Sequence, residues 1–473
     1  MHKIAQKSWS EGIFKAYDIR GRYPEEINED AAYKIARAFA RYLKLEVRSW
    51  KLEVEKGKLK IVVSSDARTS SPALKEAFLD GLLDEGVEII DAGLTTTPMH
   101  YFIVNKTEAD GGAMITASHN PAEFNGIKLT KKGAVPIGDG SGLGEIKGEA
   151  TRGIFAAASQ SEAVRKASVR RKDFIEDYIN FLTSHFQLLT SHAINIVACS
   201  GNGMTSILLG KLFLKFPKMK IEFLHDDLDM TFPNHEADPL KTQNLQDVQS
   251  SVLDKKADLG ISFDGDGDRV GFVDENGNVV SGDIITALLA KKYAKSGEKI
   301  VYDLRSSRTV KEEIEAGGAK ALESRVGHAF IKALMRKENA VFGGELSGHY
   351  YFRDFFYADS AVFAALDLLD LLRLENKKLS ELVKPLLRYA KSEEINFRPK
   401  ADQPRAGEFL DKIAAYFSDG KISYLDGIKV EYSDWWFSLR LSNTEDFVRL
   451  NLEASAPKLL AEKKKLLEEL LAE

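Results

Sequence analysis

The sequence predicts an α/β protein: three related α/β domains with mixed sheets, followed by a smaller C-terminal α+β domain. One observation is a pattern of strand, polar turn, amphipathic helix and two further strands that occurs three times. Another is the change to alternating aromatic and β-branched residues near the C-terminus. The third is the length, because 473 residues are too many for a single hydrophobic core.

The three copies begin at residues 60, 195 and 299, and each starts with a β-branched strand. Strand, turn and helix read KIVVSSDARTSSPALKEAF, NIVACSGNGMTSILLGKLF and KIVYDLRSSRTVKEEIEA. The second strands read VEIIDAG, KIEFLHD and AKALESR, and the third strands run into polar loops within 111–121, 259–269 and 340–349. Open α/β sheets bind ligands at the carboxyl ends of strands, so we expect the chemistry in these three loops.

The C-terminal segment has a different pattern. GIKVEYSDWWFSLRLSNTEDFVRLNLEA alternates in the manner of antiparallel strands, and the helical SAPKLLAEKKKLLEELLAE follows it. The polar stretches 147–169 and 391–407 are predicted to connect domains. We therefore expect domains over residues 1–160, 161–280, 281–390 and 391–473.

Composition restricts the class of partner. A net charge of −5 argues against nucleic acid or an anionic membrane. There is no apolar run long enough to span a membrane, and MHKIAQKSWSEGIF lacks the apolar core of a signal peptide, so a cytoplasmic protein is predicted. The single cysteine, Cys199, excludes a disulfide framework, and its place after a strand-like run predicts a buried residue rather than a nucleophile.

Three aspartates in LGISFDGDGDRVGFV predict a metal site. Asp264, Asp266 and Asp268 lie two apart between glycines, and such close carboxylates need a cation among them. Oxygen ligands favour Mg²⁺, Mn²⁺ or Ca²⁺, and Mg²⁺ prefers a phosphate oxygen as a further ligand. The run also resembles an EF-hand loop, but Arg269 occupies the glycine position and strands are predicted on both sides. A solvated acidic turn is the remaining alternative.

The segment MITASHNP places Ser118 at the end of an apolar strand, before His119 and an Asn-Pro turn. A turn serine without a function would explain this position. The loop nevertheless matches the aspartate loop in the repeat, and Lys128 follows ten residues later. A phosphorylated serine beside a metal is a good phosphoryl donor. It would also supply the phosphate oxygen that Mg²⁺ prefers as a further ligand beside the three aspartates.

Two further loops suit a sugar phosphate. GGELSGH offers Glu345, Ser347 and His349, a set able to hydrogen-bond vicinal hydroxyls. RLSNTED combines one cation with neutral donors, as a phosphate monoester requires. The residues of this second loop are Arg440, Ser442, Asn443 and Thr444.

Two other segments carry less information by themselves. RVGHAFIKALM places His328 and Lys332 on one face of a starting helix, where a histidine is more often a helix-end residue than a catalyst. KAYDIRG presents Tyr17 and Arg20 near the N-terminus.

The motifs KAYDIRG, TASHNP, DGDGDR, GELSGH and RLSNTE, in this order, resemble those of the α-D-phosphohexomutase superfamily, above all its phosphomannomutase/phosphoglucomutase branch. The resemblance spans nearly the whole chain. It implies four domains around a central cleft, which carry in order the phosphoserine loop, the metal loop, the sugar loop and the phosphate loop.

The resemblance also implies roles for individual residues. Ser118 corresponds to the phosphorylated serine, which completes the Mg²⁺ shell of Asp264, Asp266 and Asp268. Glu345 and Ser347 match residues that hold the 3- and 4-hydroxyls of the sugar, and the RLSNTE residues match the loop that grips the phosphate that is not transferred. The other active-site positions are Tyr17, Arg20, His119, Lys128, Arg269, His328 and His349; Arg20, His328 and His349 are candidates for the base.

The implied reaction is reversible phosphoryl transfer between the 1- and 6-positions of mannose and/or glucose phosphate. It proceeds through a phosphoserine enzyme and a hexose 1,6-bisphosphate, which also serves as activator. Arg269 and Lys128 are expected to stabilise the equatorial oxygens of the transferred group. A monomer or homodimer with a small phosphosugar as its partner is expected.

One departure from the family pattern and two alternatives accompany this interpretation. Many relatives have a proline in the last loop where this chain has Asp446-Phe447, and the extra carboxylate is expected to weaken phosphate binding unless it points outward. A phosphoglucosamine mutase would differ only at the 2-substituent of the sugar, although Glu-Leu-Ser-Gly-His fits a hexose better. A catalytically silent sugar-phosphate or Ca²⁺-binding protein is the other alternative, and the intact Ser118 and aspartate triad argue against it.

Overall fold

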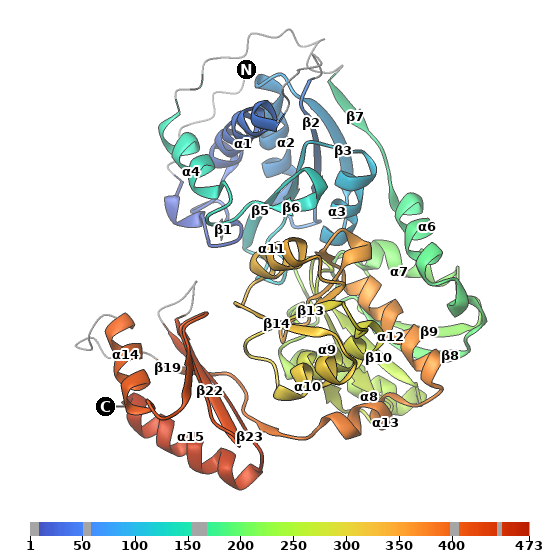
Figure 1. Cartoon of the computed structure of the whole chain (residues 1–473). Helices are drawn as coiled ribbons and strands as arrows, with labels where there is room; N and C mark the ends of the chain where they lie inside the picture. Colours follow the sequence, from blue (N-terminus) through green and yellow to red (C-terminus); the bar gives the residue numbers. More distant parts are fainter. Residues whose placement is uncertain are drawn as a thin grey trace. The chain divides into compact units, whose positions relative to one another are not determined.

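The computed structural model describes residues 9–50, 58–153, 155, 168–397, 406–441 and 447–472. Figure 1 shows the elements of the chain, which divides into two compact units. Unit 1 comprises Met1–Val280 and Ser347–Leu379, and unit 2 comprises Ser281–Leu346 and Ser380–Glu473. Within the described residues, no helix combines the length and the apolar character that crossing a bilayer would require.

The first sheet of unit 1 is mixed. Its strand order is β1-β5-β4-β2-β3-β7, with β6 paired to β5. The central strand β2 is parallel to β3 and β4, whereas β5 is antiparallel to both β4 and β1. The strands are β1 Ile19–Arg22, β2 Lys60–Ser65, β3 Glu88–Leu94, β4 Gly111–Ile115, β5 Phe124–Lys131, β6 Val135–Pro136 and β7 Val169–Arg171.

Helices cover both faces of this sheet. A Cβ on Gly111 would meet Leu43 and Phe39 of α1 (Glu29–Trp50), whereas one on Gly112 would meet His100 and Val104 of α3 (Thr97–Lys106). Since successive strand residues point to opposite faces, α1 and α3 lie on opposite sides of the sheet. The helices α2 (Ser71–Asp84) and α4 (Leu143–Arg152) pack against α1.

The second sheet of unit 1 has the order β12-β11-β10-β8-β9. Its central strand β8 is parallel to β9 and β10, and β11 is antiparallel to β10. The aspartate loop therefore lies between two strands, which excludes an EF-hand. The strands are β8 Ile194–Cys199, β9 Met219–Leu224, β10 Leu259–Phe263, β11 Val270–Asp274 and β12 Val279–Val280; the helices of this region are α6 Ile175–His185, α7 Ser206–Phe213 and α8 Gln246–Lys255. Unit 1 also contains β16 Tyr350–Phe352, β17 Ala358–Asp359 and α12 Ala361–Glu375.

Unit 2 begins with the third copy of the repeat. Its first strand β13 is again parallel to its second, β14, and to its third, β15. All three copies thus place the first strand between the second and the third, as three related α/β domains require. The elements are α9 Gly282–Tyr293, β13 Lys299–Asp303, α10 Arg308–Ala316, β14 Lys320–Ser324, α11 His328–Glu338 and β15 Phe342–Gly344.

The C-terminal part of unit 2 is an antiparallel sheet with helices, as predicted. The strand order is β18-β23-β22-β21-β20, and β19 also pairs with β23. We predicted that residues 391–407 connect two domains, and this prediction is wrong for the residues that form β19. Ile395 and Phe397 of this strand pack on the core of the sheet, because residues two apart in a strand point to the same face. The elements are α13 Leu379–Val383, β18 Ala390–Lys391, β19 Ile395–Phe397, α14 Ala406–Tyr416, β20 Lys421–Ser423, β21 Ile428–Glu431, β22 Trp435–Leu441, β23 Val448–Ala454 and α15 Pro457–Ala472.

Candidate active site

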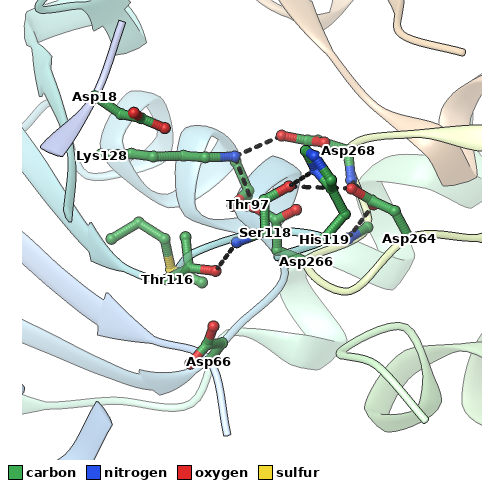
Figure 2. A network of polar contacts seen from close by, with 12 residues as sticks. Asp18, Asp66, Thr97, Thr116, Ser118, His119, Lys128, Asp264, Asp266 and Asp268 are labelled. Carbon is green, nitrogen blue, oxygen red and sulfur yellow. Dashed lines mark hydrogen bonds and ion pairs between the residues drawn. The ribbon is translucent and has the colours of Figure 1, made fainter. Parts of the chain in front are cut away.

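Ser118 lies on the loop that follows β4, and its backbone is in the left-handed region with φ +56°. Non-glycine residues adopt this conformation at a cost, and it occurs often at functional sites. The backbone N–H of Ser118 donates to Thr116 Oγ1 at 2.9 Å, and its hydroxyl donates to Asp264 Oδ2 at 3.1 Å (Figure 2). His119 Nδ1 lies 3.3 Å from the same hydroxyl oxygen. The loop therefore brings Ser118 to the aspartate run, 146 residues away in the chain.

Arg68, which was not predicted, holds this loop from behind. Its side chain is fully buried, and its Nε donates to Asp66 at 3.2 Å. Its terminal nitrogens donate, at 2.7–3.0 Å, to the backbone carbonyls of Ser118, Asn120, Pro121 and Phe124. The only signal in the sequence is an Asp-x-Arg triplet at the end of the first strand, which two of the three copies share. The first copy has it at Asp66 and Arg68, and the third copy has it at Asp303 and Arg305.

The aspartate loop is held by its first carboxylate. Asp264 Oδ1 accepts hydrogen bonds from the backbone N–H groups of residues 267, 268 and 269 at 2.9–3.1 Å. A Cβ at Gly265 would lie 2.4 Å from the carbonyl oxygen of Ser118, and Gly267 has φ +76°. The two glycines thus allow the loop to turn tightly and to approach the serine backbone closely.

The triad fits a divalent cation. Donor oxygens of Asp264, Asp266 and Asp268 lie within 4.8 Å of one another, and all three side chains are buried. Among the described residues, Asp266 Oδ1 and Asp268 Oδ1 have no hydrogen-bond partner although both are buried, an arrangement that is costly unless a ligand is present. Carboxylate oxygens are the ligands that Mg²⁺, Mn²⁺ and Ca²⁺ prefer. The triad is therefore able to hold such an ion beside the Ser118 hydroxyl.

Lys128 supplies positive charge to the same cluster. Its Nζ lies 2.6 Å from Asp266 Oδ2 and 2.6 Å from Asp268 Oδ2, and Thr97 Oγ1 donates to Asp266 Oδ2 at 2.5 Å (Figure 2). Burial opposes the charge on Lys128, but the two carboxylates outweigh it, so the pKa of Lys128 is raised well above its usual range. Burial, and then the charges of Asp268 and Asp266, hold the pKa of Asp264 well above its usual range, and the positive charge of Arg269 opposes them only in part. A bound cation would favour the ionised form of Asp264.

His349 connects Arg269 to two carboxylates. Arg269 Nε donates to His349 Nε2 at 2.9 Å, and His349 Nδ1 lies 2.9 Å from Asp359 Oδ2. Because Nε2 accepts from Arg269, Nδ1 is the ring nitrogen that carries a proton. Nδ1 is also 3.7 Å from Asp268 Oδ1. The sequence predicted Arg269 and His349 separately. It predicted neither the hydrogen bond between them nor the contact of His349 with Asp359.

Arg20 and His119 complete the surroundings of the serine. Arg20 of β1 donates to the side chain of Asn120, two residues after Ser118, and to Asp18 at 2.5 Å. Burial, then the positive charges of Arg269 and Arg20, hold the pKa of His119 well below its usual range. The His119 imidazole is therefore neutral at physiological pH. Tyr17 is half-buried just before β1.

Unit 2 holds a second set of the predicted residues. Arg305 lies 2.8 Å from Asp303 and 3.4 Å from Glu345, and the backbone N–H of Leu346 donates to Asp303 at 2.9 Å. Glu394 Oε2 lies 3.9 Å from Arg305 and accepts from Arg440 at 3.2 Å. Ion pairs thus connect the predicted sugar-binding loop to the strand that carries Arg440, through two residues that the sequence did not predict.

The remaining predicted residues are distributed between the units. His328 is the first residue of α11 in unit 2, and Ser347 is buried in unit 1. Ser442, Asn443, Thr444 and Asp446 lie outside the described residues.

Three family models match the chain in order. They are domains I, II and III of the phosphoglucomutase/phosphomannomutase alpha/beta/alpha fold, over residues 11–155, 176–277 and 281–389. The chain belongs to this family. The match covers the three copies of the repeat, each with its polar loop, and accounts for their related topologies.

Known members of the family match nearly the full length. A phosphomannomutase of Methanocaldococcus jannaschii is 40% identical over 472 residues, covering 97% of each chain. A phosphomannomutase of Escherichia coli K12 is 36% identical over 450 residues, covering 93% of this chain and 94% of that protein. A crystal structure of a family protein from Burkholderia thailandensis aligns with TM-score 0.86 at 29% identity over 98% of both chains. The chain is accordingly a phosphohexomutase, as the motifs implied.

Proposed function

We propose that this phosphohexomutase interconverts the 1- and 6-phosphates of mannose and/or glucose, with Ser118 as the residue that carries the phosphoryl group. The observation that supports this most directly is the Ser118 hydroxyl, 3.1 Å from a buried aspartate triad that has two unsatisfied oxygens. A phosphoryl donor needs concentrated positive charge around its oxygens, and Lys128 lies at the same cluster. The names of the matching relatives, phosphomannomutases in both cases, support the choice of sugar.

In the proposed reaction the bond from Ser118 Oγ to phosphorus breaks as a bond from phosphorus to the free sugar hydroxyl forms. The hydroxyl proton passes to a base, and the Ser118 oxygen takes up a proton as it leaves phosphorus. The bisphosphate then turns so that its other phosphate returns to Ser118. Asp264, Asp266 and Asp268 would hold Mg²⁺, which when bound neutralises charge on the transferred group. Lys128 and Arg269 would stabilise the same oxygens.

The observed contacts favour particular residues for each proton transfer of the proposed reaction. His349 accepts from Arg269 and faces Asp359 with its other nitrogen, so it is better suited to orient Arg269 than to act as a base. The neutral imidazole of His119, 3.3 Å from the serine oxygen, can accept the proton that Ser118 loses on rephosphorylation. Arg20 and His328 remain the candidates for deprotonating the sugar hydroxyl.

The rest of the prediction belongs to the same proposal. Glu345 and Ser347 would bind the 3- and 4-hydroxyls, with Arg305 orienting the Glu345 carboxylate. Arg440, Ser442, Asn443 and Thr444 would bind the phosphate that is not transferred, and Tyr17 would line the site. Hexose 1,6-bisphosphate as activator, the four domain ranges around a central cleft, the monomeric or homodimeric state and the cytoplasmic location all stay predictions.

A ³¹P NMR turnover assay tests the function. The full chain would be supplied with Mg²⁺, a trace of hexose 1,6-bisphosphate and, in parallel, mannose 1-phosphate, glucose 1-phosphate or glucosamine 1-phosphate. We expect conversion of either or both of the first two to the 6-phosphate. Conversion of glucosamine 1-phosphate alone would instead assign a phosphoglucosamine mutase. No conversion, together with an unphosphorylated Ser118, would support the silent binding protein.

Arg68→Lys tests whether the buried arginine positions the serine loop. Lysine keeps a charge beside Asp66 but cannot span the four carbonyls that the guanidinium holds. A displacement of the loop of about 1 Å is expected to lower kcat by roughly 10²-fold. The KM for the sugar phosphate is expected to change little, because Arg68 binds the loop and not the ligand. Steady-state kinetics would be compared with Arg170→Lys, at an exposed arginine of β7; a kcat within about threefold of wild type would contradict the role.

A further inference from the structure

A second cluster of metal-binding side chains lies in unit 1, formed by none of the residues assigned to the active site. Donor atoms of Cys199, His225 and His235 lie within 4.8 Å of one another. Cys199 ends β8, His225 directly follows β9, and His235 lies on the loop that leads to α8. The three residues come from separate segments, so only the fold brings them together.

The distances fit a tetrahedral metal site. Cys199 Sγ lies 3.7 Å from His235 Nε2. With metal–sulfur and metal–nitrogen bonds of about 2.3 and about 2.0 Å, two tetrahedral ligands of one zinc ion lie roughly 3.5 Å apart. A thiol–imidazole hydrogen bond would explain this distance too. It would not explain why His225 also lies at the pair, with its ring centroid 5.1 Å from that of His235 and the two rings nearly perpendicular, at 81°.

Each imidazole is also oriented by an oxygen acceptor. His235 Nδ1 lies 2.8 Å from the carbonyl oxygen of Glu236, so Nδ1 carries the proton and the lone pair of Nε2 faces Cys199. His225 Nε2 lies 2.8 Å from Asp247 Oδ2. Histidines that bind metals characteristically have their second nitrogen held by a carbonyl or a carboxylate in this way.

The ligand set selects a particular class of metal. One sulfur and two imidazole nitrogens favour zinc and similar thiophilic ions, whereas Mg²⁺ prefers oxygen. Cys199 is buried and both histidines are half-buried, so the histidines are partly accessible to solvent. A water molecule would complete a four-coordinate shell.

We propose that Cys199, His225 and His235 form a second metal site for zinc or a similar thiophilic ion, distinct from the aspartate triad. Such an ion would connect the end of β8 to the segment after β9. The loop that follows Cys199 also backs the aspartate loop, since the backbone N–H of Met204 donates to the carbonyl of Gly265 at 2.8 Å. The expected role of the ion is therefore structural, in fixing the support of the aspartate loop.

Co²⁺ provides a direct test, because Cys199 is the only cysteine of the chain. A thiolate-to-cobalt charge-transfer band in the near ultraviolet can then arise from Cys199 alone. The full-length protein, treated with chelator and then kept in excess Mg²⁺ to occupy oxygen sites, would be titrated with Co²⁺. We expect the band to saturate at one ion per chain and to be displaced by Zn²⁺.

Variants separate the site from unspecific binding at the thiol. Cys199→Ser should abolish the band, and His235→Gln should weaken Co²⁺ binding by at least about 10-fold. His185→Gln, at an exposed histidine in the last turn of α6, should bind as wild type does. The half-buried His235 keeps the test valid if Cys199→Ser fails to fold. Absence of the band in the wild type, or equal affinity in His235→Gln, would overturn the proposal and leave an ordinary thiol–imidazole hydrogen bond.

Discussion

Ser118→Ala is expected to lower kcat by at least about 10⁴-fold, since it removes the hydroxyl oxygen that is proposed to carry the phosphoryl group. The substitution removes one oxygen, the atom 3.1 Å from Asp264 Oδ2. The fold should persist, because serine already occupies the left-handed conformation at this position and alanine tolerates it at similar cost. Binding of hexose phosphate should survive, since the residues proposed to grip the sugar are unchanged.

Two measurements make this prediction specific. Intact-mass spectrometry after incubation with hexose 1,6-bisphosphate should show one phosphate on the wild type and none on Ser118→Ala. Turnover and thermal unfolding would be compared with Ser250→Ala, which removes the same oxygen from an exposed serine of α8. A phosphate retained by Ser118→Ala, or turnover close to that of Ser250→Ala, would disprove the assignment.

Asp266→Asn is expected to produce the second-largest effect, a decrease in kcat of roughly 10²- to 10⁴-fold. The substitution removes a charge from the triad and replaces one of two buried oxygens that have no hydrogen-bond partner. It also deprives Lys128 of one of its two carboxylates. The Mg²⁺ concentration for half-maximal activity should therefore rise by at least about 10-fold, while the KM for the sugar phosphate changes little.

The Mg²⁺ requirement of Asp266→Asn distinguishes two roles of Asp266, as a metal ligand or only as an ion-pair partner of Lys128. A role limited to the ion pair with Lys128 predicts a loss of thermal stability without a change in the Mg²⁺ requirement. A ligand role predicts a changed Mg²⁺ requirement, which titration of activity with Mg²⁺ would reveal. Asp254→Asn, at an exposed aspartate of α8, should leave both quantities as in the wild type; an unchanged Mg²⁺ requirement in Asp266→Asn would remove Asp266 from the ligand set.

Local patterns in the sequence determined the architecture. The β-branched runs starting near Lys60, Asn195 and Lys299 became the central strands β2, β8 and β13, because strand periodicity and the turn residues that follow are properties of neighbouring residues. The polar loops after the third strands were likewise predictable, since open α/β sheets present those ends to ligands. The family followed from five ordered motifs, and the prediction was correct.

The tertiary structure alone decided which side chains meet and with what charge. The Asp-x-Arg triplet does not indicate that Arg68 binds the backbone of the Ser118 loop, and no pattern in the sequence indicates that Lys128 is shared by Asp266 and Asp268. These contacts join residues 50 to 140 positions apart, which only the folded chain brings together, and no periodic pattern records that. The same packing pairs Arg269 with His349 and brings Cys199 to two histidines. The sequence by itself therefore identified the residue types and the loops, whereas packing assigned their partners, and with them the pKa values on which the chemistry depends.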